Sequence, residues 1–184
     1  EVAFQSGVAY AEGANAISGM GADFKDVNND GRPDIWHTAI ENETFPLYLN
    51  NGGGDFSDVT SKSGLWGTRN MSGWSNGIFD FDNDGWKDLF VARGNVLDNI
   101  ALFSIRKYEE PNAVFRNLGK AKFQDVSAEA GPDFQKAAPH RGVAFDVRQG
   151  RHGTEMQVAV RPDLAELRQA GERDDVGGLL MPAL

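Results

Sequence analysis

Two nine-residue segments gather carboxylate and amide oxygens around a glycine. Residues 26–34 read DVNNDGRPD and residues 80–88 read DFDNDGWKD. Side chains at positions 1, 3 and 5 can converge on one centre if the backbone curls, and the glycine at position 6 permits the left-handed conformation that continues the curl. Calcium prefers about six to eight hard oxygen ligands. The two segments are therefore predicted to be calcium-binding loops.

Each loop is expected to hold one Ca²⁺ through side chains at positions 1, 3, 5 and 9 and through the backbone carbonyl at position 7. Two carboxylates about 4 Å apart repel by about 4 kcal/mol at an effective dielectric of about 20, and a dication removes that penalty. The predicted ligands are Asp26, Asn28, Asp30, the carbonyl of Arg32 and Asp34 in the first loop, and Asp80, Asp82, Asp84, the carbonyl of Trp86 and Asp88 in the second.

Two other interpretations of these loops were weighed. Asp, Asn and Gly also build metal-free turns, because Asx side chains bond to nearby backbone groups. An EF-hand loop needs glutamate at position 12 and flanking helices. Position 12 is His37 in the first loop and Val91 in the second, and the flanks are predicted strands, which excludes the EF-hand. Two loops in register within a repeat favour calcium over plain turns.

A repeat relates the two halves of the chain. The segment YLNNGGGDFSDVTSKSGL at residues 48–65 matches FRNLGKAKFQDVSAEAGP at residues 115–132 with a shift of 67 and no gaps. The loop segments match with a shift of 54. The N-terminal EVAFQSGV resembles the tail of one more copy, and HRGVAF at residues 140–145 begins a weaker third copy of the loop segment.

Each unit contains short strands separated by turn residues. Residues 34–40 and 88–92 are β-branched or aromatic runs, and residues 48–56 read as strand, Asn/Gly turn and strand. Four short strands per unit are what one propeller blade requires, and a single such sheet must stack on neighbours to bury its faces. The predicted fold is all-β, a fragment of a β-propeller with about two to three blades of four-stranded antiparallel sheet carrying calcium loops.

Composition narrows the classes of partner. Residues 1–100 hold 15 acidic and 6 basic side chains, a net charge of −9, whereas residues 101–184 hold 12 of each. The acidic excess argues against nucleic acid and suits cations. The chain has no cysteine, which rules out disulfides and thiolate metal sites. No apolar run approaches the length of a membrane span, and no signal peptide is visible at the N-terminus.

The motifs GMGADFKDVNNDGRPD, NNGGGDFSDVTSKSGL, GWSNGIFDFDNDGWKDLFVARG and NAVFRNLGKAKFQDVSAEAGP, followed by HRGVAF, carry a resemblance. They resemble the FG-GAP/VCBS repeats of integrin-α-like β-propellers, and most of all the bacterial relatives of cartilage acidic protein that carry an ASPIC/UnbV-type domain. The resemblance covers residues 1–146. It implies a propeller with calcium in the loops of its blades, an exported or cell-surface protein (extracellular or periplasmic), and binding rather than catalysis.

The expected third loop departs from this pattern. Asp146 is followed by VRQGRHG, so that Arg148 and Gly150 stand where positions 3 and 5 need oxygen ligands. Residues 147–184 have lost the repeat and are predicted to be a divergent, frame-shifted or disordered tail. An intact D-x-D-x-D-G in another reading frame of the gene would support a frameshift. Residues 161–173 are an alternative candidate for a short helix, with Pro162 near its start.

The proposed role is a calcium-binding module for cell adhesion or ligand capture, with an unidentified protein or carbohydrate as ligand and neighbouring propeller blades as further partners. The alternative is a propeller enzyme or enzyme subunit acting on glycans or lipids, although no catalytic motif stands out. The tryptophans could stack on sugars, but packing between blades was preferred. The histidines are not spaced as metal ligands. The four tryptophans are Trp36, Trp66, Trp74 and Trp86, and the three histidines are His37, His140 and His152.

Overall fold

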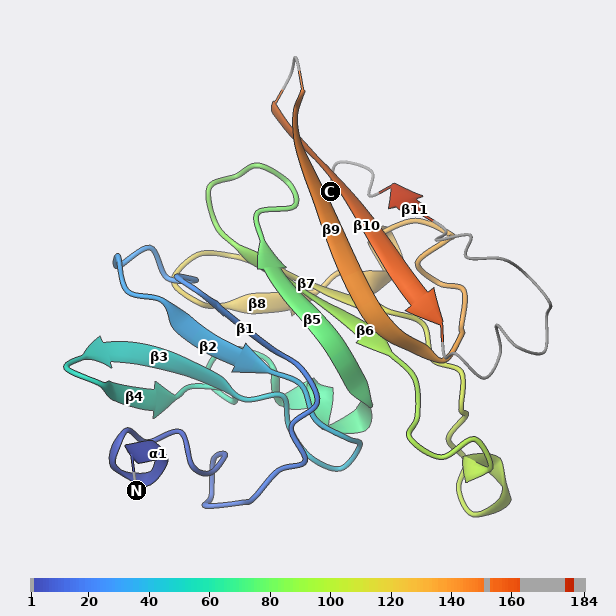
Figure 1. The fold of residues 1–184 in the computed structure, drawn as a ribbon, viewed down its shortest axis with the longest axis horizontal. Coiled ribbons are helices and arrows are strands. Elements are labelled where there is room, and N and C mark those ends of the chain that lie inside the picture. The colour runs from blue at the N-terminus through green and yellow to red at the C-terminus, as the bar shows by residue number, and fades with distance from the viewer. Residues whose placement is uncertain (1, 151–152, 163–177, 181–184) are drawn as a thin grey trace.

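The computed structural model describes residues 2–150, 153–162 and 178–180. Within them the chain forms three antiparallel sheets and a few short helices. Figure 1 shows the sheets side by side along the molecule, in the order of the sequence. The predicted all-β architecture, a fragment of a β-propeller, is confirmed.

The first sheet has the order β1-β2-β3-β4. Its first two strands are joined by the first aspartate loop, and its last two by a glycine turn in which Gly52, Gly53 and Gly54 all have positive φ. Only glycine adopts that conformation without strain, so the sequence GGG sets the position of the hairpin. The strands are β1 (Ala22–Lys25), β2 (Asp34–His37), β3 (Leu47–Gly52) and β4 (Asp55–Asp58).

The second sheet repeats the first, with the order β5-β6-β7-β8. Tyr48 pairs with Asp58 in the first sheet and Phe115 with Asp125 in the second, so the shift of 67 is also a structural equivalence. The 13 residues by which the two shifts differ lie in the longer connection after β6, which contains a short 3-10 helix, η2 (Ile100–Leu102). The strands are β5 (Gly73–Phe79), β6 (Asp88–Arg93), β7 (Ala113–Asn117) and β8 (Phe123–Asp125).

The third sheet consists of β9 (His140–Gly150), β10 (Gly153–Pro162) and β11 (Gly178–Leu180). β9 begins where the third copy was predicted, but it runs through Asp146, whose Cα pairs with that of Gln157. No loop forms there. Part of the predicted tail is therefore strand. A short helix was a candidate for residues 161–173. Arg161 and Pro162 instead form the end of β10, and residues 163–173 lie outside the described residues.

The first strands of the three sheets lie next to one another, β1 against β5 and β5 against β9. Glycines permit this approach. A Cβ at Gly21 would lie 2.3 Å from the Trp74 carbonyl oxygen, and one at Gly77 would lie 2.3 Å from the Phe145 ring. Gly21, which directly precedes β1, and Gly77, within β5, are thus required by packing between blades. This arrangement is that of the inner strands of a propeller.

Two apolar cores fill the spaces between consecutive sheets. The first joins Trp36, Phe45 and Leu47 of one sheet to Leu89 and Phe115 of the next. The second joins the other face of the second sheet to the third, and includes Phe90, Val114, Phe134, Val158 and Val160. Strand side chains alternate between faces, so Leu89 and Phe90 enter different cores. Each sheet is stabilised by its neighbours, as a blade must be.

The segment that leaves each outer strand latches onto the following sheet. Phe123 N–H donates to the Ser63 carbonyl (2.8 Å), and Phe56 N–H donates to the Ser6 carbonyl (2.9 Å). Gly7 and Gly64 have φ values of +82° and +85°, in agreement with the prediction that the N-terminal EVAFQSGV is the tail of one more copy. Short helices flank these latches: α1 (Val2–Gln5), η1 (Trp66–Asn70) and η3 (Ser127–Glu129).

Within the described residues, no helix has both the length and the apolar character needed to cross a bilayer.

Candidate metal centre

The two aspartate loops connect the first and second strands of their sheets and share one backbone conformation. Position 4 is left-handed in both, with φ of +59° at Asn29 and +60° at Asn83. The glycines at position 6 follow, with φ of +85° at Gly31 and +89° at Gly85. Asparagine and glycine are the residues that tolerate this conformation. The sequence therefore curls each loop locally, as predicted.

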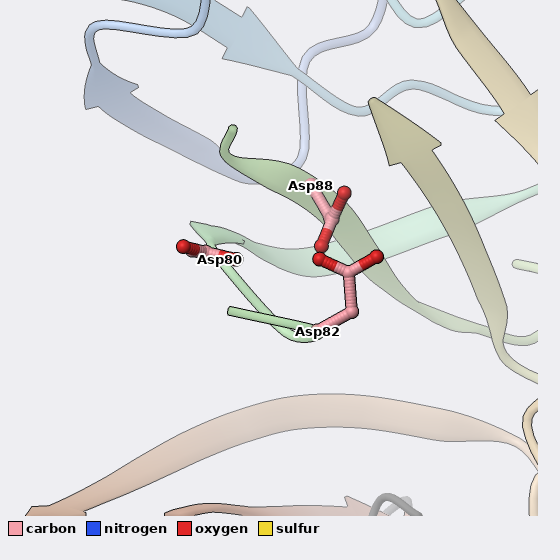
Figure 2. A group of neighbouring side chains, drawn as sticks. All are labelled: Asp80, Asp82 and Asp88. Atoms are coloured by element: carbon pink, nitrogen blue, oxygen red, sulfur yellow. The ribbon is translucent and has the colours of Figure 1, made fainter. Parts of the chain in front are cut away.

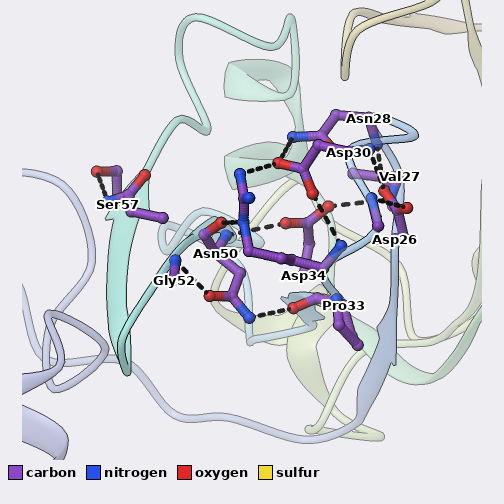
Figure 3. Close-up of polar contacts among 12 residues, drawn as sticks. Asp26, Val27, Asn28, Asp30, Pro33, Asp34, Asn50, Gly52 and Ser57 are labelled. Atoms are coloured by element: carbon purple, nitrogen blue, oxygen red, sulfur yellow. Dashed lines mark hydrogen bonds and ion pairs between the residues drawn. The ribbon is translucent and has the colours of Figure 1, made fainter.

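In the first loop, the aspartate at position 1 holds the curl by accepting backbone N–H groups. Asp26 Oδ1 accepts from Asp30 N (3.2 Å), and its Oδ2 accepts from Gly31 N (2.8 Å). Asp30 Oδ1 accepts from Arg32 N (2.9 Å), and this bond is the main reason that the pKa of Asp30 is lowered. Figure 3 shows these side chains gathered over the loop.

The second loop repeats these bonds. Asp80 Oδ1 accepts from Asp84 N (3.1 Å), Asp80 Oδ2 accepts from Gly85 N (2.9 Å), and Asp84 Oδ1 accepts from Trp86 N (2.8 Å). The backbone of both loops is thus organised around the carboxylate at position 1, so the site is formed by the fold itself.

Three carboxylates of the second loop come together. One oxygen each from Asp80, Asp82 and Asp88 lies within 4.8 Å of the others, and Figure 2 shows the Asp82 and Asp88 carboxylates facing one another. Oxygens bound to one Ca²⁺ at about 2.3–2.6 Å lie at most about 5 Å apart. Spacing and donor type therefore both fit calcium. In the first loop the amide of Asn28 stands where Asp82 stands in the second.

The aspartate at position 9 joins each loop to the third strand of its sheet. Asp34 Oδ2 accepts from Val27 N (2.9 Å), and its Oδ1 accepts from Asn50 N (2.9 Å). Asp88 likewise accepts from Phe81 N (2.9 Å) and Asn117 N (2.8 Å). Both aspartates are fully buried. The aspartate at position 9 therefore fixes its loop to the sheet through hydrogen bonds and is also a candidate metal ligand.

Burial raises the pKa of Asp88 to about 7 against the effect of its two backbone hydrogen bonds, and the charges of Asp82 and Asp84 raise it further. Burial also raises the pKa of Asp34. Removing these carboxylates from water favours their neutral forms, and a nearby dication favours the ionised form. A cation in the loop would relieve this electrostatic cost.

Arginines partly supply positive charge to both loops. Arg32 reaches back over the first loop, with its guanidinium 2.6 Å from Asp30 Oδ2. In the second loop Arg116, from β7, lies 2.5 Å from Asp82 Oδ2. That oxygen is buried and lacks a partner with hydrogen-bond geometry, so the contact with Arg116 is an ion pair only. Asp82 keeps acceptor capacity for a further ligand.

Asn117, which the shift of 67 equates with Asn50, connects the two loops. Asn117 Nδ2 donates to the carbonyl of Val27 in the first loop (2.8 Å) and to that of Lys87 in the second (2.9 Å). Its counterpart Asn50 bonds to the Pro33 carbonyl (3.0 Å). Asn29 Nδ2 adds a bond to the Gly85 carbonyl (3.0 Å). In the sequence, the roles of Asn50 and Asn117 are indicated only by the N-x-G motif that both copies of the repeat share.

The structure thus brings Asp80, Asp82 and Asp88 together as predicted. Asp84, like Asp30, is engaged with the backbone N–H of position 7. Metal ligation by any of the ten predicted residues, including the carbonyls of Arg32 and Trp86, stays a prediction.

The tryptophans and histidines fall into different environments. Trp36 is fully buried in the first core, as the preference for blade packing predicted, whereas Trp66 is 50% exposed. His37 and His140 are half-buried, and burial lowers the pKa of each. His152 lies outside the described residues.

These sheets, latches and loops define a β-propeller-type repeat. Residues 26–91 match the family model of the FG-GAP-like repeat. The match begins at Asp26, the first aspartate of the first loop, and ends within β6. The matched segment therefore contains both loops, and FG-GAP repeats form propellers. No curated protein matches the sequence.

Proposed function

We propose that this chain is part of a calcium-stabilised β-propeller that serves as a binding module of an exported or cell-surface protein. The observation that carries the proposal is the convergence of Asp80, Asp82 and Asp88 in the second of two loops that occupy the same position of successive sheets. Protein or carbohydrate is the proposed class of ligand. The finer likeness to bacterial relatives of cartilage acidic protein is proposed from the sequence motifs alone.

Calcium would act on structure rather than on chemistry. The position-9 aspartates tie each loop to its sheet, and Asn117 ties one loop to the other, so an ion in the loop would stabilise the junction between blades. Calcium at tenfold its dissociation constant adds about 1.4 kcal/mol per site. Extracellular modules bind at about 10⁻⁴–10⁻³ M, which suits an exported protein.

Thermal unfolding with EDTA and with added CaCl₂ tests the proposal. Chelation is expected to lower the melting temperature by about 3–6 °C for each occupied site, because each site adds about 1.4 kcal/mol and 1 kcal/mol shifts the melting temperature by about 2–4 °C in a chain of this length. Added calcium should restore it. Asp82→Ala, which removes the position-3 ligand of the second loop, should lose about half of the response, whereas the matched control Asp133→Ala, on an exposed loop, should keep it. Equal melting with and without EDTA would contradict the proposal.

A role in binding without catalysis is also proposed. In its support, Glu110 is the most buried of the glutamates whose burial the structure describes, and it is held in an ion pair with Arg93 (2.6 Å). A carboxylate fixed in this way is a packing element rather than a free acid or base. Hydrolysis of chromogenic glycosides or esters by the purified protein, abolished by Glu110→Gln, would favour the enzyme alternative instead.

A further inference from the structure

Trp66 opens η1 on the side of the molecule away from the aspartate loops, and half of its surface is exposed. Burying a tryptophan is among the largest apolar gains available to a protein, so an exposed one is a feature to explain. The blade packing that accounts for Trp36 does not account for Trp66.

Trp66 lines a pocket of about 260 Å³. Three segments distant in sequence form its walls: residues 11–17 of the N-terminal arm, residues 42–44 between β2 and β3, and η1. The principal side chains of the lining are Asn15, Ile17, Asn42, Glu43, Trp66 and Arg69.

Hydrogen bonds between the three segments hold the pocket walls together. Asn42 N–H donates to the Arg69 carbonyl (2.8 Å), and Phe45 N–H donates to Thr68 Oγ1 (2.9 Å). Glu43 is oriented by Ser18, whose N–H donates to Oε2 (2.6 Å). A pocket with fixed walls loses little entropy when it binds a ligand.

Several polar groups of the lining have no hydrogen-bond partner among the residues that the structure describes. The Arg69 guanidinium makes neither a hydrogen bond nor an ion pair there, and it lies over the Trp66 ring, 5.0 Å from the centroid, in a cation–π contact. The side-chain amide of Asn42 and the hydroxyl of Thr44 likewise lack hydrogen-bond partners within the described chain. Donors and acceptors therefore surround an exposed aromatic ring.

We propose that this pocket binds one sugar ring of a neutral glycan, an inference that rests on the binding role proposed above. A pyranose has an apolar C–H face that packs on an indole, and a rim of hydroxyls that pair with amide, hydroxyl, carboxylate and guanidinium groups. The volume is just below the range of about 300–1,000 Å³ typical of drug-sized ligands, so one ring fits better than an oligosaccharide. The facing charges of Glu12, Glu43 and Arg69 favour a neutral ligand over an anion.

Saturation-transfer difference NMR with the methyl glycosides of glucose, galactose, mannose, fucose and N-acetylglucosamine tests the proposal. At least one glycoside should bind to the wild-type chain in calcium buffer. Trp66→Ala should weaken it by about tenfold, since an aromatic contact is worth up to about 1.5 kcal/mol. Trp66→Phe should bind better than Trp66→Ala. The matched control Phe103→Ala, at an aromatic ring 73% exposed elsewhere, should bind like wild type.

Binding of no glycoside, or binding unchanged in Trp66→Ala, would overturn the sugar site. Neither result bears on calcium, because EDTA melts of the same samples report on the loops separately. Circular dichroism of Trp66→Ala and the intermediate binding of Trp66→Phe separate a lost contact from a lost fold.

Discussion

At the scale of single residues, Asn117 connects the two loops of the candidate site. Its side-chain amide bonds to carbonyls of both loops, its Oδ1 accepts from Gly119 N (3.0 Å), and its backbone N–H donates to Asp88. It is 1% exposed. A buried carbonyl left without a partner costs more than a hydrogen bond contributes, because it was removed from water.

Asn117→Ala is therefore expected to lower the free energy of unfolding by about 2–4 kcal/mol, since it leaves two carbonyls unpaired. Asn50→Ala is the matched control. Asn50 makes equivalent bonds in a more exposed setting, and its side-chain amide donates to one carbonyl, that of Pro33, rather than to two, so the loss should be about half as large. Urea unfolding of the three proteins measures the difference. Equal losses would show that the bond between loops contributes little.

His37 gives a prediction on pH. Its ring stacks on Tyr48 at 5.6 Å, and burial lowers its pKa although Thr38 and the charge of Asp58 act the other way. The unfolded chain therefore protonates His37 at a higher pH than the folded chain, so this contribution to stability is complete above about pH 6.5 and is lost as the pH falls.

His37→Gln should consequently lose less stability than wild type between pH 7.5 and pH 5.5, measured by urea unfolding in calcium buffer. The comparison with wild type is needed because Asp34, Asp88 and Glu110 have raised pKa values and act with the opposite sign. Parallel pH profiles of the two proteins would contradict the prediction.

At the scale of elements, the latch after each outer strand depends on a glycine. Gly64 has φ of +85°, and a Cβ there would lie 2.6 Å from the Phe123 carbonyl oxygen. Gly7 meets the Phe56 carbonyl in the same way. The repeated glycine thus serves both the turn and the close approach of the next sheet.

Gly64→Ala should therefore cost about 2–4 kcal/mol, combining the strain of a left-handed alanine with the displacement of β8. Gly53→Ala is a matched control, because its φ is +63° but no atom lies within 4 Å of a new Cβ. It should cost about 1 kcal/mol. Thermal melts compare the two, and a similar loss in both would show that the latch tolerates displacement.

At the scale of the whole molecule, stability comes from apolar layers between sheets. Phe90 is fully buried and meets Phe134 and Phe145 edge-on, with ring centroids 5.7 Å apart in each pair. Phe145 comes from β9, so the second core exists only where the third sheet packs on the second.

Phe90→Ala should lower the free energy of unfolding by about 3–5 kcal/mol through the cavity it leaves. Phe103→Ala, which removes an exposed ring, should change it by less than about 0.5 kcal/mol. Guanidinium unfolding measures both. A small effect at Phe90 would mean that the third sheet packs loosely on the second.

The sequence by itself determined the repeat, the strand pattern and the curl of both loops. These features depend on local residues: Gly31 and Gly85 fix the turn, and alternating apolar residues fix the strand faces. It also indicated that the third loop was lost at Asp146, where β9 indeed runs on as a strand.

Only the tertiary structure decided which side chains meet across the sheets. Asn117 reaches Val27 across 90 residues of chain, Arg116 comes from β7 to Asp82, and Trp66 is left exposed while Trp36 is buried. Sequence spacing records contacts within a turn or a hairpin. Contacts between blades depend on how separate sheets stack, and that is set by packing of the whole array rather than by any one segment.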